Sequence, residues 1–153
     1  MNKITKTQLS QTLQQHQLWL NSDGVNGKRA NLRHADLYRT DLRHADLGDA
    51  NLRDANLHRA NLYYADASGA NLQGANLQNA NLHNTNLQGA NLQGANLHNA
   101  NLRGADLRLA RFDVNIRDCW GFHNAKFTPD ALPWLILHPG WPKWKDTVRI
   151  KYT

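Results

Sequence analysis

The 153-residue chain has few of the features that would place it outside the cytoplasm. Its single cysteine, Cys119, excludes an intrachain disulfide and is compatible with the cytoplasm, where we expect the protein to reside. No apolar run is long enough to cross a membrane. The glutamine-rich N-terminus also lacks the apolar segment of a signal peptide. We therefore expect no membrane partner.

Charge is scarce in the middle of the chain. Between Ala60 and Leu102 there is no Lys or Arg, and the only acidic residue is Asp66. From Ala30 to Ala110 seven Arg are matched by seven Asp, so the net charge of +6 comes from the flanking segments. An elongated nucleic-acid-binding surface needs a row of cations to follow the phosphates. We therefore expect no nucleic-acid partner.

What the sequence has instead is a five-residue repeat. Seventeen consecutive blocks of the form Ala-(Asn/Asp)-Leu-X-X occupy residues 30–114. The first position is Ala except at Thr40 and Thr85, and the third is Leu except at Ala67 and Phe112. A period of five matches neither an α-helix nor a β-strand. A repeat of fixed period indicates a solenoid.

A chain that turns a corner after every block would place all of the leucines on its axis. Four corners close a square coil of about 20 residues, with the small Ala near the corners, and successive coils stack about 4.8 Å apart. Asn side chains one coil apart, such as Asn31 and Asn51, are then expected to form hydrogen-bonded ladders. The predicted core is the third-position column: Leu32, Leu37, Leu42, Leu47, Leu52, Leu57, Leu62, Leu72, Leu77, Leu82, Leu87, Leu92, Leu97, Leu102, Leu107, Phe112, Phe122 and Phe127.

The repeat resembles that of the pentapeptide-repeat family. The lead-in from Trp19 to Leu32 is similar to that of many bacterial members, especially cyanobacterial ones. The resemblance implies an all-β fold, a right-handed quadrilateral β-helix. We expect a non-enzymatic scaffold that presents its rigid surface to an unknown protein partner. The alternative is a DNA mimic that binds a topoisomerase (gyrase), as one branch of the family does. The neutral rod and the positive net charge count against it.

The predicted organisation has three parts. An N-terminal helical cap occupies residues 1–24, a β-helix of about five coils occupies 25–129, and a short C-terminal helix and tail at 130–153 cover the last coil. The ends of a β-helix are open sheet edges, which invite end-to-end association unless they are covered. We expect a monomer, or a homodimer that forms through the C-terminal part.

The predicted N-terminal helix comprises residues 5–20. Thr5 or Thr7 can cap its start. Its apolar side is formed by three leucines: Leu9, Leu13 and Leu20. Residues 25–29 then read as a degenerate entry block of the repeat.

The repeat is irregular at two places. The block that contains Ala67, Ser68 and Gly69 has no leucine, so we expect either a void or a local inward bend. Beyond residue 114, Arg117 falls at an inward position, and because a buried unpaired Arg is costly we expect a slip that turns Ile116 inward. Later, residues 148–152 alternate apolar and basic side chains, as a half-buried strand does. We expect this strand to pack on the last coil or on the corner formed by the outward apolar residues Leu109 and Val114.

Arg, Tyr and His gather on three faces of the first two coils. Arg and Tyr dominate the energetics of many protein interfaces. An ordinary soluble surface would explain the same residues, since interleaved Asp side chains would neutralise some of the arginines. The candidate protein-binding patch consists of Arg33, Tyr38, Arg39, Arg43, Arg53, His58, Arg59, Tyr63 and Tyr64.

The histidines of the repeat do not form a metal or catalytic set. His58 and His98 share a face but lie two coils apart, about 10 Å, which is too far to share a zinc ion. His34 and His44 lie on different faces, and no histidine pair has a carboxylate placed to orient it. We therefore expect no catalytic residue, no metal and no cofactor.

Overall fold

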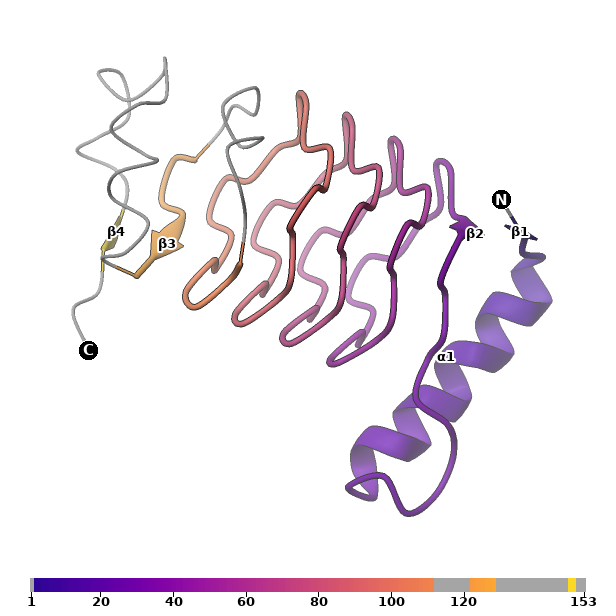
Figure 1. Cartoon of the computed structure of the whole chain (residues 1–153). Helices are drawn as coiled ribbons and strands as arrows, with labels where there is room; N and C mark the ends of the chain where they lie inside the picture. Colours follow the sequence, from indigo (N-terminus) through magenta and orange to yellow (C-terminus); the bar gives the residue numbers. More distant parts are fainter. Residues whose placement is uncertain (1, 112–121, 129–148, 151–153) are drawn as a thin grey trace.

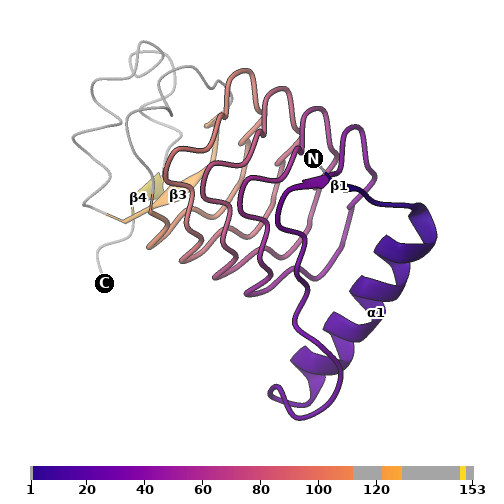
Figure 2. The same cartoon turned by 45° about the vertical axis from the view of Figure 1, so that its right-hand side comes forward.

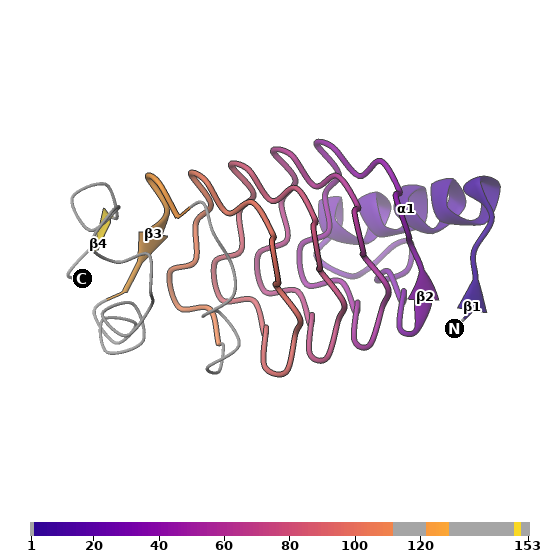
Figure 3. The same ribbon diagram turned by 90° about the horizontal axis from the view of Figure 1, so that it is seen from above.

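The computed structural model describes residues 2–111, 122–128 and 149–150. Regular coils of the chain stack in a row, with a helix and a short strand at one end and two short strands at the other (Figures 1 and 3). The elements in chain order are β1 (Asn2–Lys3), α1 (Lys6–Asn21), β2 (Ala35–Asp36), β3 (Lys126–Phe127) and β4 (Arg149–Ile150).

Each coil contains 20 residues, which is four blocks of the repeat. Parallel β-bridges join residues 20 positions apart, beginning with Asn31 and Asn51 and ending with Asp106 and Lys126. We number the coils by their residues: coil 1 is 30–49, coil 2 is 50–69, coil 3 is 70–89 and coil 4 is 90–109. The chain therefore closes one turn in the four blocks that the repeat predicts.

Each block from 30–34 to 105–109 ends in a tight turn. In the first block, the Leu32 carbonyl accepts a hydrogen bond from the Ala35 N–H at 3.1 Å, and His34 has a φ of 57°. The fifth residue of every block from 34 to 109 has this left-handed backbone. Gly, Asn and Asp, which adopt it most readily, are therefore frequent at the fifth position.

The second-position side chains connect the coils on the outside of the rod. Within a block, Asn31 Oδ1 accepts a hydrogen bond from the Arg33 N–H at 3.3 Å. Between coils, Asn81 Nδ2 donates to Asn61 Oδ1 at 3.0 Å, and Asn101 Nδ2 donates to Asn81 Oδ1 at 3.3 Å. The amide ladder that the sequence predicts is thus present on the surface.

The core is one continuous column of side chains. The third-position leucines from Leu32 to Leu107 are at most 3% exposed, and most of the Ala side chains are equally buried. Further along, Phe122 and Phe127 are fully buried, with ring centroids 5.5 Å apart. The repeat therefore brings one large and one small apolar side chain per block into the interior.

The block without a leucine keeps the same frame. Ala67 is fully buried in the leucine position. Its neighbour Asp66 bridges to Asp46 in the preceding coil and to Asn86 in the following one. The backbone therefore passes this block with its register intact.

α1 covers the open end of coil 1. A capping box begins the helix: Thr5 Oγ1 accepts from the Gln8 N–H at 3.1 Å, and Gln8 Oε1 accepts from the Thr5 N–H at 2.9 Å. Thr5 rather than Thr7 is therefore the cap. Leu9 is buried in the core and Leu13 packs against it. Figure 2 shows the chain turning back after α1 to enter coil 1.

A buried histidine joins α1 to coil 1. His16 is fully buried, its Nδ1 accepts a hydrogen bond from the Ala30 N–H at 3.1 Å, and its ring stacks on Trp19. Its Nε2 is near the Gly48 backbone without reaching hydrogen-bonding geometry. Burial lowers the pKa of His16, and the Asp46 carboxylate opposes this only in part. The contact is therefore built around a neutral imidazole.

Short strands pair with the coils at both ends. β1 runs parallel to β2, with Asn2 opposite Ala35 and Lys3 opposite Asp36. β4 runs parallel to β3, with Arg149 opposite Lys126 and Ile150 opposite Phe127. β4 lies within residues 148–152, for which the sequence predicts a strand. The β1 pairing was not predicted, because a two-residue strand leaves no periodic signal.

The entry segment differs from the predicted degenerate block. Val25 is 83% exposed, and the Lys28 N–H donates to the Gln15 carbonyl of α1 at 3.0 Å rather than to a coil. Among the described residues, bridges between coils begin at Asn31. The turn that follows α1 therefore belongs with the helix.

Several predictions fall outside the described residues. They are the core position of Phe112, the slip around Ile116 and Arg117, the place of Val114, and the helix after residue 130. In the ranges that are described, α1 is neither long nor apolar enough to cross a membrane.

Candidate functional site

The predicted patch residues lie at three corners of coils 1 and 2. We call these the first corner (residues 33–34 and 53–54), the second corner (38–39 and 58–59) and the third corner (43–44 and 63–64). All three consist of the fourth and fifth positions of their blocks, which the turns project outward. The structure brings the patch residues together within each corner.

The second corner combines aromatic rings with cations. Tyr38 lies 5.5 Å from His58 between ring centroids, and the Arg39 guanidinium lies 5.1 Å from the centroid of the Tyr38 ring. Tyr38 remains 45% exposed. Neither Arg39 nor Arg59 forms an ion pair with another described residue. This corner therefore offers an aromatic face and two uncompensated charges to a ligand.

The third corner is an aromatic cluster. Tyr63 and Tyr64 pack edge to face with centroids 4.5 Å apart, and Tyr64 stacks on His44 at 5.8 Å. His83 of coil 3 packs against Tyr63 at 5.3 Å. The predicted patch omitted His44 and His83. The period of 20 could have identified His83, since it lies one coil after Tyr63.

Two arginines of the predicted patch, Arg43 and Arg53, form ion pairs with carboxylates. Arg43 forms a bidentate pair with Asp41, with Nη2 2.7 Å from Oδ2 and Nε 2.8 Å from Oδ1. The hydrogen bonds from Arg43 lower the pKa of Asp41 to about 2. At the first corner, Arg53 Nε lies 3.3 Å from Asp54 Oδ2, and Arg33 is exposed. The first corner is therefore mainly an ionic surface.

A groove of about 790 Å³ separates α1 from coil 1. Tyr38, Arg39 and His44 line its coil side, and Leu9 and Leu13 line its helix side. The groove thus connects the second corner to the third. Sequence analysis did not predict it, because it depends on how α1 crosses the first coil.

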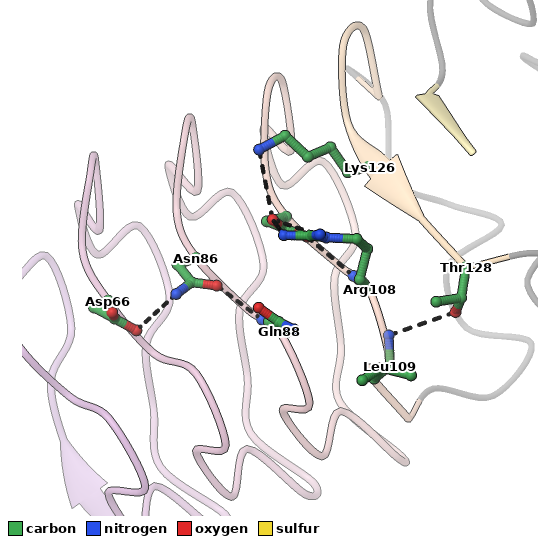
Figure 4. A network of polar contacts seen from close by, with 8 residues as sticks. Asp66, Asn86, Gln88, Arg108, Leu109, Lys126 and Thr128 are labelled. Atoms are coloured by element: carbon green, nitrogen blue, oxygen red, sulfur yellow. Dashed lines mark hydrogen bonds and ion pairs between the residues drawn. The ribbon is translucent and has the colours of Figure 1, made fainter. Parts of the chain in front are cut away.

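The far end of the rod has a polar network that is satisfied internally (Figure 4). Asp106 pairs with Arg108 at 2.6 Å and with Lys126 at 3.5 Å. Burial alone would raise the pKa of Asp106, but the hydrogen bonds and charge of Arg108 outweigh it and leave the pKa below its ordinary value. The Leu109 N–H donates to Thr128 Oγ1 at 3.4 Å, and the Leu109 side chain is 61% exposed, as predicted for its outward position.

Across the described part of the chain, no three His, Cys, Asp or Glu side chains are grouped so that they could hold a metal ion. Exposed tyrosines and unpaired arginines recur at the centres of protein interfaces.

The comparisons with known proteins agree with the repeat architecture. The family model described as pentapeptide repeats matches residues 21–49, 35–74 and 75–113, with 8 copies. No curated protein sequence matches the chain significantly.

Three solved structures illustrate the similarity. Rfr23, a pentapeptide repeat protein of the cyanobacterium Cyanothece 51142, is 36% identical, with 68% of this chain and 64% of that chain covered and a TM-score of 0.30. HetL of Nostoc sp. strain PCC 7120, a pentapeptide repeat protein involved in the regulation of heterocyst differentiation, is 32% identical, with coverages of 64% and 51% and a TM-score of 0.32. Full-length QnrB1, a plasmid-mediated fluoroquinolone resistance protein, is 18% identical, with coverages of 74% and 74% and a TM-score of 0.41.

The chain spans between half and two thirds of the length of HetL and Rfr23. Since the family model matches more than half of the chain, this protein belongs to the pentapeptide-repeat family.

Proposed function

We propose that this protein is a non-enzymatic cytoplasmic scaffold whose rod, a right-handed quadrilateral β-helix, presents a rigid surface to another protein. The observation that carries the proposal is the exposure of Tyr38, beside the unpaired Arg39 in the groove, and of Tyr64 in the neighbouring aromatic cluster. Large aromatic side chains gain most from burial by a partner, and Arg adds directional hydrogen bonds. The proposed contact surface is therefore the second and third corners.

The backbone beneath these corners supports the proposal. The His44 N–H donates to the Tyr63 carbonyl at 3.0 Å, and the Tyr64 N–H donates to the His83 carbonyl at 3.1 Å. Each corner is thus fixed to the next coil by main-chain hydrogen bonds. A surface that is already ordered loses little conformational entropy when it binds.

The charge distribution does not favour the DNA-mimic alternative. Imitation of DNA requires regularly spaced negative charge, and residues 60–102 contain one carboxylate, Asp66, which already accepts a hydrogen bond from Asn86. We expect no inhibition of gyrase in a supercoiling assay and no nucleic-acid or membrane partner. We also propose that the protein is a monomer, or a homodimer joined through its C-terminal part.

Site-specific photocrosslinking tests the scaffold proposal. A benzophenone amino acid replaces Tyr38 or Tyr64 in the full chain, expressed in cells of the source organism. Matched controls carry it at Gln93 or His98, which are exposed on coil 4. We expect a discrete protein adduct from Tyr38 and Tyr64 and none from the controls. Equal adducts at all four positions, or none at any, would overturn the proposal.

A further inference from the structure

We propose that the groove between α1 and coil 1 binds an extended peptide segment of the partner protein, which adds a strand to the open edge of coil 1 at Asp41. The inference rests on the proposed scaffold function and specifies the partner's chemistry. The segment carries an acidic residue that meets Lys6 and Arg39. A small apolar residue follows it and meets Leu9 and Leu13.

The edge at Asp41 has free main-chain hydrogen-bonding groups. In the following coils, the second residue of each block donates its N–H to the coil before, as the Asn61 N–H does to the Thr40 carbonyl at 2.9 Å. Coil 1 has no coil before it. The Asp41 N–H and C=O therefore have no partner among the described residues, and Asp41 is exposed. Free edge groups of this kind are a template for strand addition.

The chain itself shows that this end of the rod accepts an added strand. On the neighbouring face, β1 pairs in parallel with β2, and the Asn2 N–H donates to the His34 carbonyl at 2.9 Å. The groove begins where β1 ends, because Ile4 and Thr5 belong to its lining. A parallel segment along the next face would form the bonds to Asp41 that β1 forms to β2. Main-chain bonds supply affinity in this mode, and alternate side chains supply specificity.

The unpaired positive charges in the groove favour an acidic residue in the bound segment. Lys6 and Arg39 both line the groove, and neither forms an ion pair with a described residue. The Asp41 carboxylate is already neutralised by Arg43. The other acidic residue of the groove is Asp46, which lies at the end of the groove farther along coil 1 and accepts a hydrogen bond from the Gly48 N–H at 3.2 Å.

The direction of the bound segment is proposed from the direction of the chain in coil 1. The bridges described in the rod and the β1–β2 pair are parallel. In the proposed complex the bound segment pairs in the same way and runs in the direction from Arg39 to Asp46. Its acidic residue therefore precedes its apolar residue. The apolar residue points toward the end of the rod, where Leu9 is buried and Leu13 is partly buried.

Peptide selection on the full chain tests the proposal. Random nonapeptides displayed on phage are selected on the protein and counter-selected on Ser10→Trp, which fills the groove from α1. The matched control is Gln11→Trp, because Gln11 is the next residue of α1 and lines a different hollow. We expect enriched peptides with an acidic residue before an apolar one. Ser10→Trp should weaken a synthetic peptide of the enriched sequence at least about tenfold, and Gln11→Trp less than about twofold.

Hydrogen exchange measured by NMR shows whether the peptide adds a strand. The Asp41 amide has no hydrogen-bond partner among the described residues, so it should exchange quickly in the free protein, and the selected peptide should slow its exchange at least about tenfold. The amide of Asn31, which is also unpaired at the edge of coil 1 but outside the groove, serves as the internal control. A bound peptide that leaves the Asp41 amide unchanged overturns strand addition.

The remaining outcomes separate this inference from the scaffold proposal. If no peptide is enriched and the crosslink from Tyr64, which lies outside the groove, persists in the Ser10→Trp chain, the groove inference fails and the scaffold stands. If crosslinks are absent at Tyr64 and Tyr38 alike, the scaffold itself fails. Dimerisation that Ser10→Trp abolishes would identify a second copy as the occupant and overturn the partner peptide.

Discussion

Coils 1 and 2 share their interior with coils 3 and 4 but have a different exterior. Leu57 in coil 2 and Leu77 in coil 3 are both fully buried in the same column. Outside, coils 1 and 2 carry the Arg, Tyr and His of the three corners. Coils 3 and 4 carry Gln, Asn and Gly at most of the equivalent positions, as at Gln73, Gln78 and Gln93. The repeat therefore specifies the rod, while the side chains at the two outward positions differ between the coils, within the preference of the left-handed fifth position for Gly, Asn and Asp.

Four further predictions test this comparison, and the largest effect concerns the shared interior. Leu57→Ala and Leu77→Ala should each lower the free energy of unfolding by about 2–5 kcal/mol, because a closed rod cannot collapse around the gap. Gln78→Ala, which changes an outward side chain, should alter it by less than about 0.5 kcal/mol. Urea denaturation measures all three. If Leu77→Ala and Gln78→Ala cost the same, the inward column is misassigned.

Removal of one buried hydroxyl group should lower the free energy of unfolding by a smaller amount. Thr85 replaces the usual Ala in coil 3, is fully buried, and donates from Oγ1 to the Leu62 carbonyl at 2.7 Å. Thr85→Ala restores the repeat but removes this bond, so stability should fall by about 0.5–1.5 kcal/mol. The Leu62 carbonyl keeps its bond from the Ala65 N–H, which limits the loss. Unchanged or increased stability in the same denaturation assay would show that the hydroxyl contributes nothing.

A pH dependence should distinguish the capped end from the coils. The folded-state pKa of His16 is lowered below 6.5 by burial, so the unfolded chain binds the proton more tightly. Stability contributed by neutral His16 is therefore present above pH 6.5 and is lost as pH falls below that value. Asp41, with its pKa near 2, affects stability only in a lower range, below its ordinary pKa of 3.8.

Thermal melts between neutral and mildly acidic pH measure this effect. His16→Asn, which retains an acceptor for the Ala30 N–H, should flatten the dependence on pH. His98→Gln, at an exposed position of coil 4, should leave it as in the parent chain. A parent chain whose melting temperature does not fall below pH 6.5 would contradict the buried neutral state of His16.

Periodicity predicted the interior but not the end of the rod. The spacing of five gave the leucine column and the amide ladders, because both depend only on positions 20 residues apart. The burial of His16 was not predicted, although the sequence contains a signal for it, since His16 continues the helical spacing of Leu9, Leu13 and Leu20. The pairing of β1 and the groove were not predicted either, because they depend on how a non-repeating segment meets the first coil. Within the candidate patch, the spacing of the blocks placed Tyr63 beside Tyr64 in the aromatic cluster of the third corner. It could not show that Arg43 forms an ion pair with Asp41.

The central claim is that the exterior of coils 1 and 2, and not the rod as such, recognises the partner. A surface exchange tests it directly: Tyr38→Gln, Arg39→Asn and Arg59→Asn give these positions the residues found 40 places later in the chain. Because the interior is untouched, the free energy of unfolding should change by less than about 1 kcal/mol. The measurement is the yield of the protein adduct from the benzophenone at position 64 in the exchanged chain. We predict that the adduct is lost while the fold is retained, and an undiminished adduct would contradict the account.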